Sequence, residues 1–185
     1  MNTYVGQIGD VFLNDSDKMG AKVVKFLQTA PTLWHYIYRA IRGTQEPVRY
    51  YHAGMVLDDK TLIEQQWNVK KDELSKILTR VVIIYRYKNI GSVKDKVYQR
   101  AIEDIGKTYD IPQLIGKTLT LLTGIKGFVR LLGAWSKENE ICVTRVGDWY
   151  EGICNFGVKT KHEITTKIID EYCVYSEEWE IVYKN

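Results

Sequence analysis

The sequence predicts a single domain of the α+β class, spanning residues 1–185, in which neighbouring strands run antiparallel. Three observations support this class. A length of 185 residues fits one domain of ordinary size. Hydrophobic residues make up 45% of the chain and charged residues 26%, as in globular proteins with a packed core. Segments with strand signals and segments with helical spacing are interspersed along the chain, with no internal repeat.

The strands are predicted from runs of β-branched and aromatic residues bounded by turn signals. Gly9-Asp10 is a turn signal before the first short strand, and Asp58-Asp59-Lys60 separates two strands as the turn of a β-hairpin. The most β-branched run, residues 81–87, predicts a central strand. The predicted strands are 11–13, 48–57, 61–69, 81–87 and 179–183.

The helices are predicted from apolar residues at helical spacing. Residues 17–29 form one such run, and a second begins at Pro31 and ends at Gly43. A third helix is predicted after Ser92, which would cap it with Asp95 three residues on, and Gly106 would end it. A short helix is also expected over residues 165–172.

The apolar stretch 111–135 is long enough to cross a membrane, but Lys117, Lys126 and Arg130 interrupt it. Charges at the centre of a bilayer are costly, so we expect no integral membrane span. This stretch and the helical segment 16–43 are instead expected to form walls of a cleft or a lid.

Composition also limits the partners and the compartment. The net charge is 26 − 23 = +3, too small by itself to indicate binding of nucleic acid. The N-terminus lacks a basic region followed by an apolar core, which favours a cytoplasmic protein. The three cysteines are an odd number without a CxxC pair, so neither a disulfide framework nor a metal site is expected.

His52 is the histidine whose surroundings best suit chemistry. His35 lies in a helical run and His162 in a polar loop, where packing and solvent exposure are the expected roles. His52 lies in the predicted hairpin, on the strand that precedes Glu64. A three-residue loop, Asp59–Thr61, would put both side chains on one face with Glu64 opposite Val56, whereas a loop one residue shorter would separate them.

Cys142 is the candidate nucleophile, and its local structure is open. The run Ile141–Val146 has the β-branched composition of a strand. The alternative is a helix that begins near Cys142, with Val143, Val146 and Trp149 facing inward. A helix N-terminus favours a thiolate and offers backbone N–H groups to an oxyanion. Cys154 and Cys173 are expected to be buried structural thiols.

Short motifs in a particular order resemble a known family. The order is reversed from the usual one, with the histidine strand first and the cysteine some 90 residues later. In this respect the chain resembles the circularly permuted papain-like cysteine hydrolases of the NlpC type, with the YiiX-like amidases as the closest branch. The motifs are Gly9–Phe12, Tyr51–Leu57, Leu62–Glu64, Tyr109-Asp110 and Ile141–Thr144.

The resemblance implies a papain-like fold and a catalytic triad. Cys142 would be the nucleophile at a helix N-terminus, His52 its base, and Glu64 the residue that orients His52. The backbone N–H of Cys142 would form the oxyanion hole. Tyr51, as a possible second donor, Gly54 and Tyr109 would contact the substrate. Neither a metal nor an organic cofactor is implied.

Two classes of function remain open from the sequence. The first is a thiol amidase or peptidase acting on a small peptide, such as a cell-wall peptide, with a lipid acyl hydrolase or acyltransferase of the same permuted fold as the alternative. The second is a non-catalytic binding module that retains the fold. At Val143 and Thr144 the chain departs from relatives that often have a small polar residue and an acid there. The sequence does not predict the oligomeric state.

Overall fold

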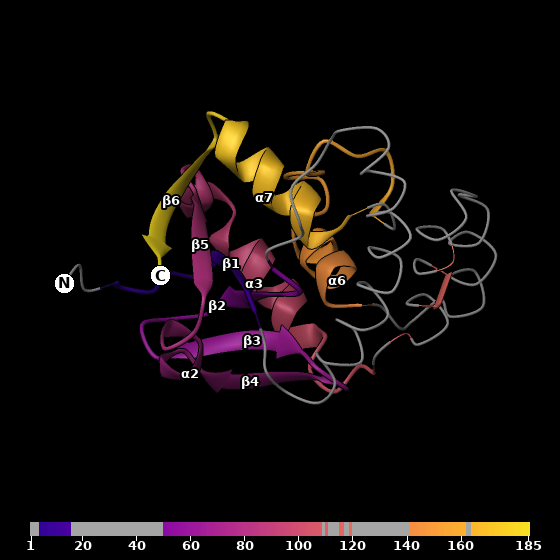
Figure 1. The fold of residues 1–185 in the computed structure, drawn as a ribbon, viewed down its shortest axis with the longest axis horizontal. Helices are drawn as coiled ribbons and strands as arrows, with labels where there is room; N and C mark the ends of the chain where they lie inside the picture. Colours follow the sequence, from indigo (N-terminus) through magenta and orange to yellow (C-terminus); the bar gives the residue numbers. More distant parts are fainter. Residues whose placement is uncertain are drawn as a thin grey trace, which may run out of the picture.

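A six-stranded sheet organises the described part of the molecule. The computed structural model describes residues 4–15, 50–108, 110, 115–116, 119, 141–161 and 164–185. Within them the strand order is β4-β3-β2-β1-β5-β6, and each neighbouring pair is antiparallel (Figure 1). This mixed architecture confirms the predicted α+β class.

The strands are β1 (Val11–Asn14), β2 (His52–Val56), β3 (Thr61–Gln65), β4 (Val69–Glu73), β5 (Val82–Tyr87) and β6 (Trp179–Lys184). The helices are α2 (Ser75–Leu78), the 3-10 turn η1 (Ile90–Ser92), α3 (Lys94–Glu103), α6 (Cys142–Trp149) and α7 (Thr166–Tyr175). The longest connections between successive described elements are residues 15–51, between β1 and β2, and residues 104–141, between α3 and α6.

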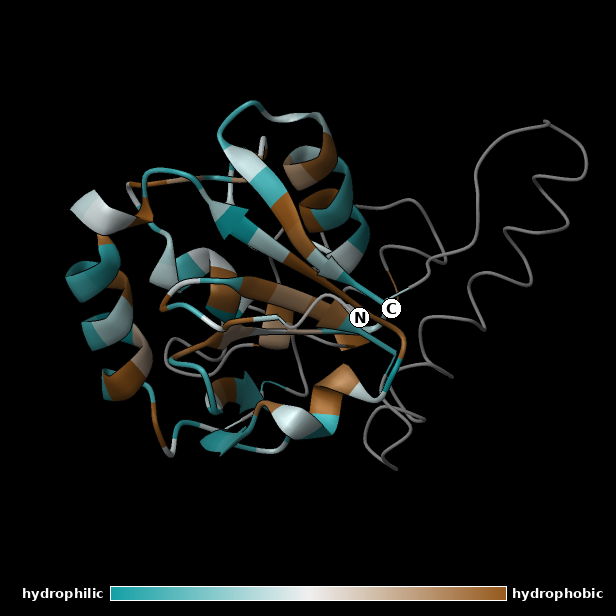
Figure 2. Cartoon of the chain, turned by 90° about the vertical axis from the view of Figure 1, so that its left-hand side faces the viewer, coloured by the Kyte–Doolittle hydropathy of each residue, from teal (hydrophilic) through white to brown (hydrophobic). Residues whose placement is uncertain are grey.

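Both faces of the inner strands β1, β2, β3 and β5 are buried, because their alternate residues enter two separate apolar clusters. On one face α3, α6 and α7 pack against the strands, and this larger cluster includes Val11, Met55, Tyr85, Val97, Val146 and Ile169. The other cluster includes Phe12, Val56, Leu62, Ile84 and Ile77 of α2. Figure 2 accordingly shows hydrophobic residues concentrated along the strands.

Most predicted elements are present, with differences at their ends. The hairpin is confirmed. Its second strand is shorter than predicted because residues 66–68 turn the chain into β4, and residues 48 and 49 of the predicted first strand lie outside the described residues. The sequence analysis missed β4, an edge strand with the charged sequence VKKDE, in which the apolar alternation is weak. The run 81–87 forms β5, which lies inside the sheet between β1 and β6.

The predicted cap of the third helix is wrong. Ser92 lies in η1, and its hydroxyl donates to the carbonyl of Asn89 at 2.9 Å. Val93 occupies the N-cap position of α3 without a side-chain hydrogen bond. The later helix is confirmed as α7, whose N-cap Thr165 accepts from the N–H of Ile168 at 3.2 Å.

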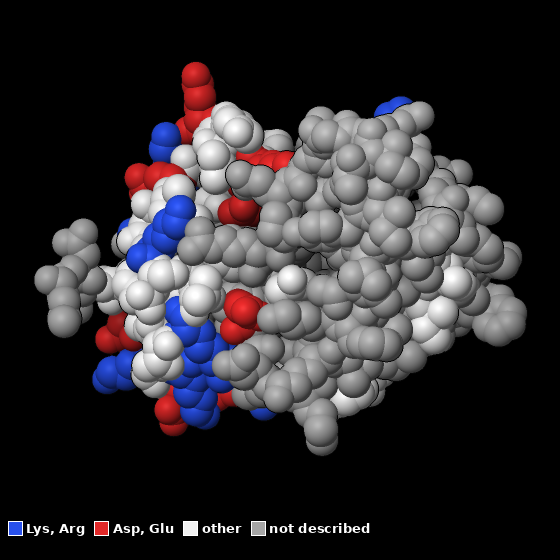
Figure 3. Space-filling model, in the orientation of Figure 1, with Lys and Arg blue, Asp and Glu red and all other residues white. Residues whose placement is uncertain are grey.

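The predicted helical segment 16–43 lies wholly outside the described residues, as does most of 111–135. Within the described ranges, none of the helices is both long and apolar enough to cross a bilayer. Positive and negative side chains are interspersed over the described part of the face in Figure 3, in keeping with the small net charge.

Candidate active site

His52 and Glu64 meet across the β2–β3 hairpin. His52 is the first residue of β2, and Glu64 lies on β3 opposite Gly54. Glu64 is therefore the diagonal neighbour of His52, a position within reach of long side chains. Nε2 of His52 lies 2.9 Å from Oε2 of Glu64, and both side chains are buried.

The hairpin register differs from the predicted one. The N–H of Leu57 donates to the carbonyl of Thr61 at 2.8 Å, so the three-residue loop is Asp58–Lys60 and not Asp59–Thr61. Asp58 fixes this loop, because its Oδ1 accepts from the N–H groups of Lys60 at 2.8 Å and Thr61 at 2.7 Å. The correction brings Glu64 two residues closer to His52 than the predicted pairing did.

Cys142 begins helix α6. Ile141 before it is extended, and its N–H donates to Oγ1 of Thr144 at 3.1 Å, which closes the first turn. Val146 and Trp149 follow at helical spacing and are buried in the core. The strand favoured by composition is therefore wrong and the helical alternative is confirmed, because packing outweighs the β propensity of this run.

A hydrogen bond joins Cys142 to His52 and completes a chain of three side chains. Because Nε2 of the ring faces Glu64, Nδ1 is the nitrogen left for the thiol. Burial alone would lower the pKa of His52, but the hydrogen bonds and charges of Cys142 and Glu64 outweigh it and raise the pKa to about 10. The imidazole is therefore held in its cationic form at neutral pH.

The second oxygen of Glu64 is also engaged. Oε1 of Glu64 accepts from the side-chain amide of Gln66, which lies at the turn after β3. Two directional contacts on one carboxylate fix its plane, and with it the plane of the imidazole. The sequence analysis did not identify Gln66, although its position two residues beyond Glu64 is a usable signal.

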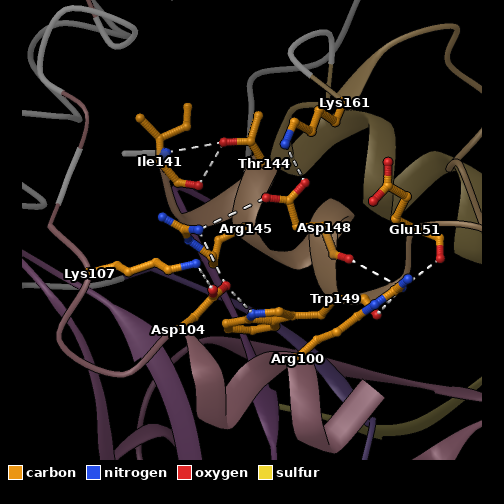
Figure 4. Close-up of polar contacts among 10 residues, drawn as sticks. All are labelled: Arg100, Asp104, Lys107, Ile141, Thr144, Arg145, Asp148, Trp149, Glu151 and Lys161. Atoms are coloured by element: carbon orange, nitrogen blue, oxygen red, sulfur yellow. Dashed lines mark hydrogen bonds and ion pairs between the residues drawn. The ribbon is translucent and has the colours of Figure 1, made fainter. Parts of the chain in front are cut away.

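Helix α3 holds α6 through a buried carboxylate (Figure 4). Asp104, directly after α3, accepts from Nε1 of Trp149 at 2.9 Å and from Nη1 of Arg145 at 3.3 Å. Lys107 also reaches Asp104 at 2.5 Å. The sequence analysis missed this cluster, since Asp104 lies 41 residues before Arg145 and 45 before Trp149 and no motif links them.

The far end of α6 is capped by Arg100 of α3. Its Nη1 donates to the carbonyl of Glu151 at 2.6 Å and to that of Trp149 at 3.3 Å (Figure 4). A cation beside the last carbonyls of a helix satisfies them and stabilises the helix dipole. Together with Asp104, this contact sets the position of α6 and hence of Cys142 at its N-terminus.

The residues expected to contact the substrate differ in their surroundings. Gly54 is packed inside the sheet, where a Cβ would lie 2.4 Å from Cζ of Phe12, so its observed role is close packing. The backbone N–H of Tyr51 donates to the carbonyl of Asn14 at 3.1 Å and is committed to the sheet. Tyr109, His35 and His162 lie outside the described residues.

The other two thiols are buried away from this arrangement. Burial raises the pKa of both Cys154 and Cys173 above the ordinary range of a thiol. Both therefore remain protonated at neutral pH and react poorly as nucleophiles. Within the described residues, no group of three or more His, Cys, Asp and Glu side chains is arranged to hold a metal ion.

Comparisons with known proteins show a structural similarity along nearly the whole chain. No family model matches the chain, and no curated protein matches it. Among solved structures, it is similar to the metalloprotein yiiX of Escherichia coli O157:H7 (DUF1105), with 15% sequence identity and a TM-score of 0.49. The similarity covers 97% of this chain and 98% of that one.

Proposed function

We propose that the protein is a thiol hydrolase that cleaves an amide bond through an acyl-enzyme on Cys142. His52 acts as the base and acid, and Glu64 orients the imidazole. The observation that carries this proposal is the continuous hydrogen-bonded chain Cys142–His52–Glu64. A nucleophile, a base and an orienting acid are the three groups that acyl transfer by a thiol requires.

The proposed reaction has two half-reactions with a balanced transfer of protons. The sulfur of Cys142, its proton held on His52, attacks the carbonyl carbon and forms a C–S bond. The C–N bond then breaks, and the imidazolium gives its proton to the departing amine. In the second half, His52 takes a proton from water as the water oxygen attacks the thioester carbon and forms a C–O bond. The C–S bond then breaks, the carboxylic acid leaves, and the proton on His52 returns to the sulfur. Backbone N–H groups at the start of α6 are suited to stabilise both oxyanions.

Selective alkylation tests the proposal. Iodoacetamide at pH 6.5–7.0, with the modified positions read by mass spectrometry of peptides, should label Cys142 faster than Cys154 and Cys173. The His52→Ala variant should lose at least about tenfold of the rate, because the thiol loses its proton acceptor. Circular dichroism of each variant shows that the fold is retained.

Turnover distinguishes an enzyme from a binding module. A peptide p-nitroanilide and a p-nitrophenyl acyl ester should be compared, with Cys142→Ala as the inactive control and Cys154→Ala as the matched active one. Cleavage of the anilide that depends on Cys142 supports the amidase, and cleavage of long-chain esters alone would indicate the lipid acyl hydrolase instead. Equal or absent alkylation of the three thiols would leave only a binding module.

A further inference from the structure

Asn14, the last residue of β1, carries a buried side-chain amide without a partner beside the proposed active site. It is fully buried, and neither its Oδ1 nor its Nδ2 has a hydrogen-bond partner. Burying an amide without hydrogen bonds is unfavourable, and most buried polar groups in proteins are satisfied. A group of this kind is a candidate for binding a ligand.

The sheet register places Asn14 next to His52. The two residues are paired across the β1–β2 ladder, and facing residues of an antiparallel pair have Cβ atoms roughly 5 Å apart. Phe12, two residues before Asn14 on the same strand, also lies beside His52, with ring centroids 6.2 Å apart. The unpartnered amide therefore borders the imidazole that contacts Cys142.

The site around Asn14 is closed to bulk solvent. Only 5% of Cys142 and 8% of His52 is exposed. Bulk water has little access to an amide in such surroundings, so a substrate held beside His52 is suited to supply the missing hydrogen bonds of Asn14. An asparagine offers one acceptor and a pair of donors, which complement the N–H and C=O of an amide. An ester keeps the carbonyl and lacks the N–H.

We propose that Asn14 is a substrate-binding residue that accepts a hydrogen bond from an amide N–H of the substrate and donates to a carbonyl beside it. The inference rests on the proposed thiol hydrolase and names its substrate class, a peptide or another amide that carries N–H. Removing Asn14 leaves the Cys142–His52–Glu64 chain in place and deprives the site of its selectivity for amides over esters.

The test compares two alkylating reagents of similar size. Iodoacetamide carries an N–H group and methyl iodoacetate does not. The rate at which each reagent modifies Cys142 is measured in the wild type, in Asn14→Leu and in Asn89→Leu, a control at an exposed position. Each rate is then divided by the rate at which glutathione reacts with the same reagent, which corrects for the reagents' own reactivity. The wild type and the control should prefer iodoacetamide, and Asn14→Leu should lose about tenfold of that preference, as expected for a buried hydrogen bond.

The stability of the variant supplies a second readout. Leucine has a similar volume and no polar atoms, so Asn14→Leu should unfold at the same or a higher temperature while losing amide preference. An unchanged preference, or an equal loss of both rates, would overturn the role of Asn14 and leave the thiol hydrolase standing. Modification of Cys142 that does not depend on His52 in the wild type would instead overturn the proposed function and this inference with it.

Discussion

At the scale of single residues, the proton on His52 is the feature that connects structure to chemistry. Its pKa is raised to about 10 despite burial, because Cys142 and Glu64 both favour the cation. We expect the imidazole to stay protonated from pH 6 to pH 8, as measured by two-dimensional NMR of ¹⁵N-labelled histidine. The variants Cys142→Ala and Glu64→Gln should each lower this pKa, since each removes one of the groups that raise it.

The same spectra contain their own control. Asp59→Asn changes an exposed carboxylate on the hairpin loop and should leave the His52 titration as in the wild type. A titration of His52 near pH 6.5 in the wild type would contradict the proposed ion pair with Cys142.

Close packing at Gly54 is a second feature at the residue scale. A Cβ there would lie 2.4 Å from Cζ of Phe12 and 2.7 Å from the carbonyl oxygen of Ile63. We expect Gly54→Ala to destabilise the protein by about 1–3 kcal/mol, because both neighbours belong to the packed sheet. Urea unfolding measures the loss. Gly91→Ala is the matched control, since a Cβ there has no atom within 4 Å, and equal losses for the two variants would contradict the packing role.

At the scale of elements, α6 depends on one buried carboxylate. Asp104 contacts Arg145 and Trp149, and Arg145 is only 2% exposed. We expect Asp104→Ala to destabilise the protein by about 3 kcal/mol, because the buried guanidinium would keep only the more distant carboxylate of Asp148, 3.9 Å away. Chemical unfolding measures this, with the exposed neighbour Glu103→Ala as control. If Asp104→Ala lowers the free energy of unfolding by less than Glu103→Ala does, Asp104 does not hold α6 in place.

The start of α6 also shows how far sequence reasoning reaches at this scale. The β-branched run at Ile141–Val146 has strand propensity, and the contacts of Val146 and Trp149 with the core, which involve distant residues, decide for a helix. Amphipathic elements with clear boundaries, such as α7 and β6, follow from local pattern alone. The charged edge strand β4 has no such pattern and was missed.

At the scale of the whole molecule, the site depends on contacts that no local pattern encodes. His52 and Glu64 could be paired from the sequence because a hairpin joins them, although the loop register was displaced by one residue at each end. The approach of Cys142 to His52, 90 residues earlier, came only from the family resemblance. Asn14 lies beside His52 because β1 pairs with β2 on one side and β5 on the other, an order set by the packing of the sheet.

The raised pKa of His52 also makes the stability of the whole molecule depend on pH. A group whose pKa is higher in the folded state stabilises the fold fully below its unfolded pKa, near 6.5, and loses this contribution as the pH rises through its folded pKa, about 10. The free energy of unfolding should therefore exceed that of His52→Gln most at pH 6, and the difference should shrink steadily towards pH 10. Urea titrations of both proteins at pH 6, 8 and 10 measure it. Burial also raises the pKa of Cys173, so the contribution of this thiol to stability decreases in the same direction as the pH rises. Because both proteins contain Cys173, its contribution cancels in the difference. A difference that grows with pH would mean that folding favours the neutral imidazole, against the charge pairing on which the proposed chemistry depends.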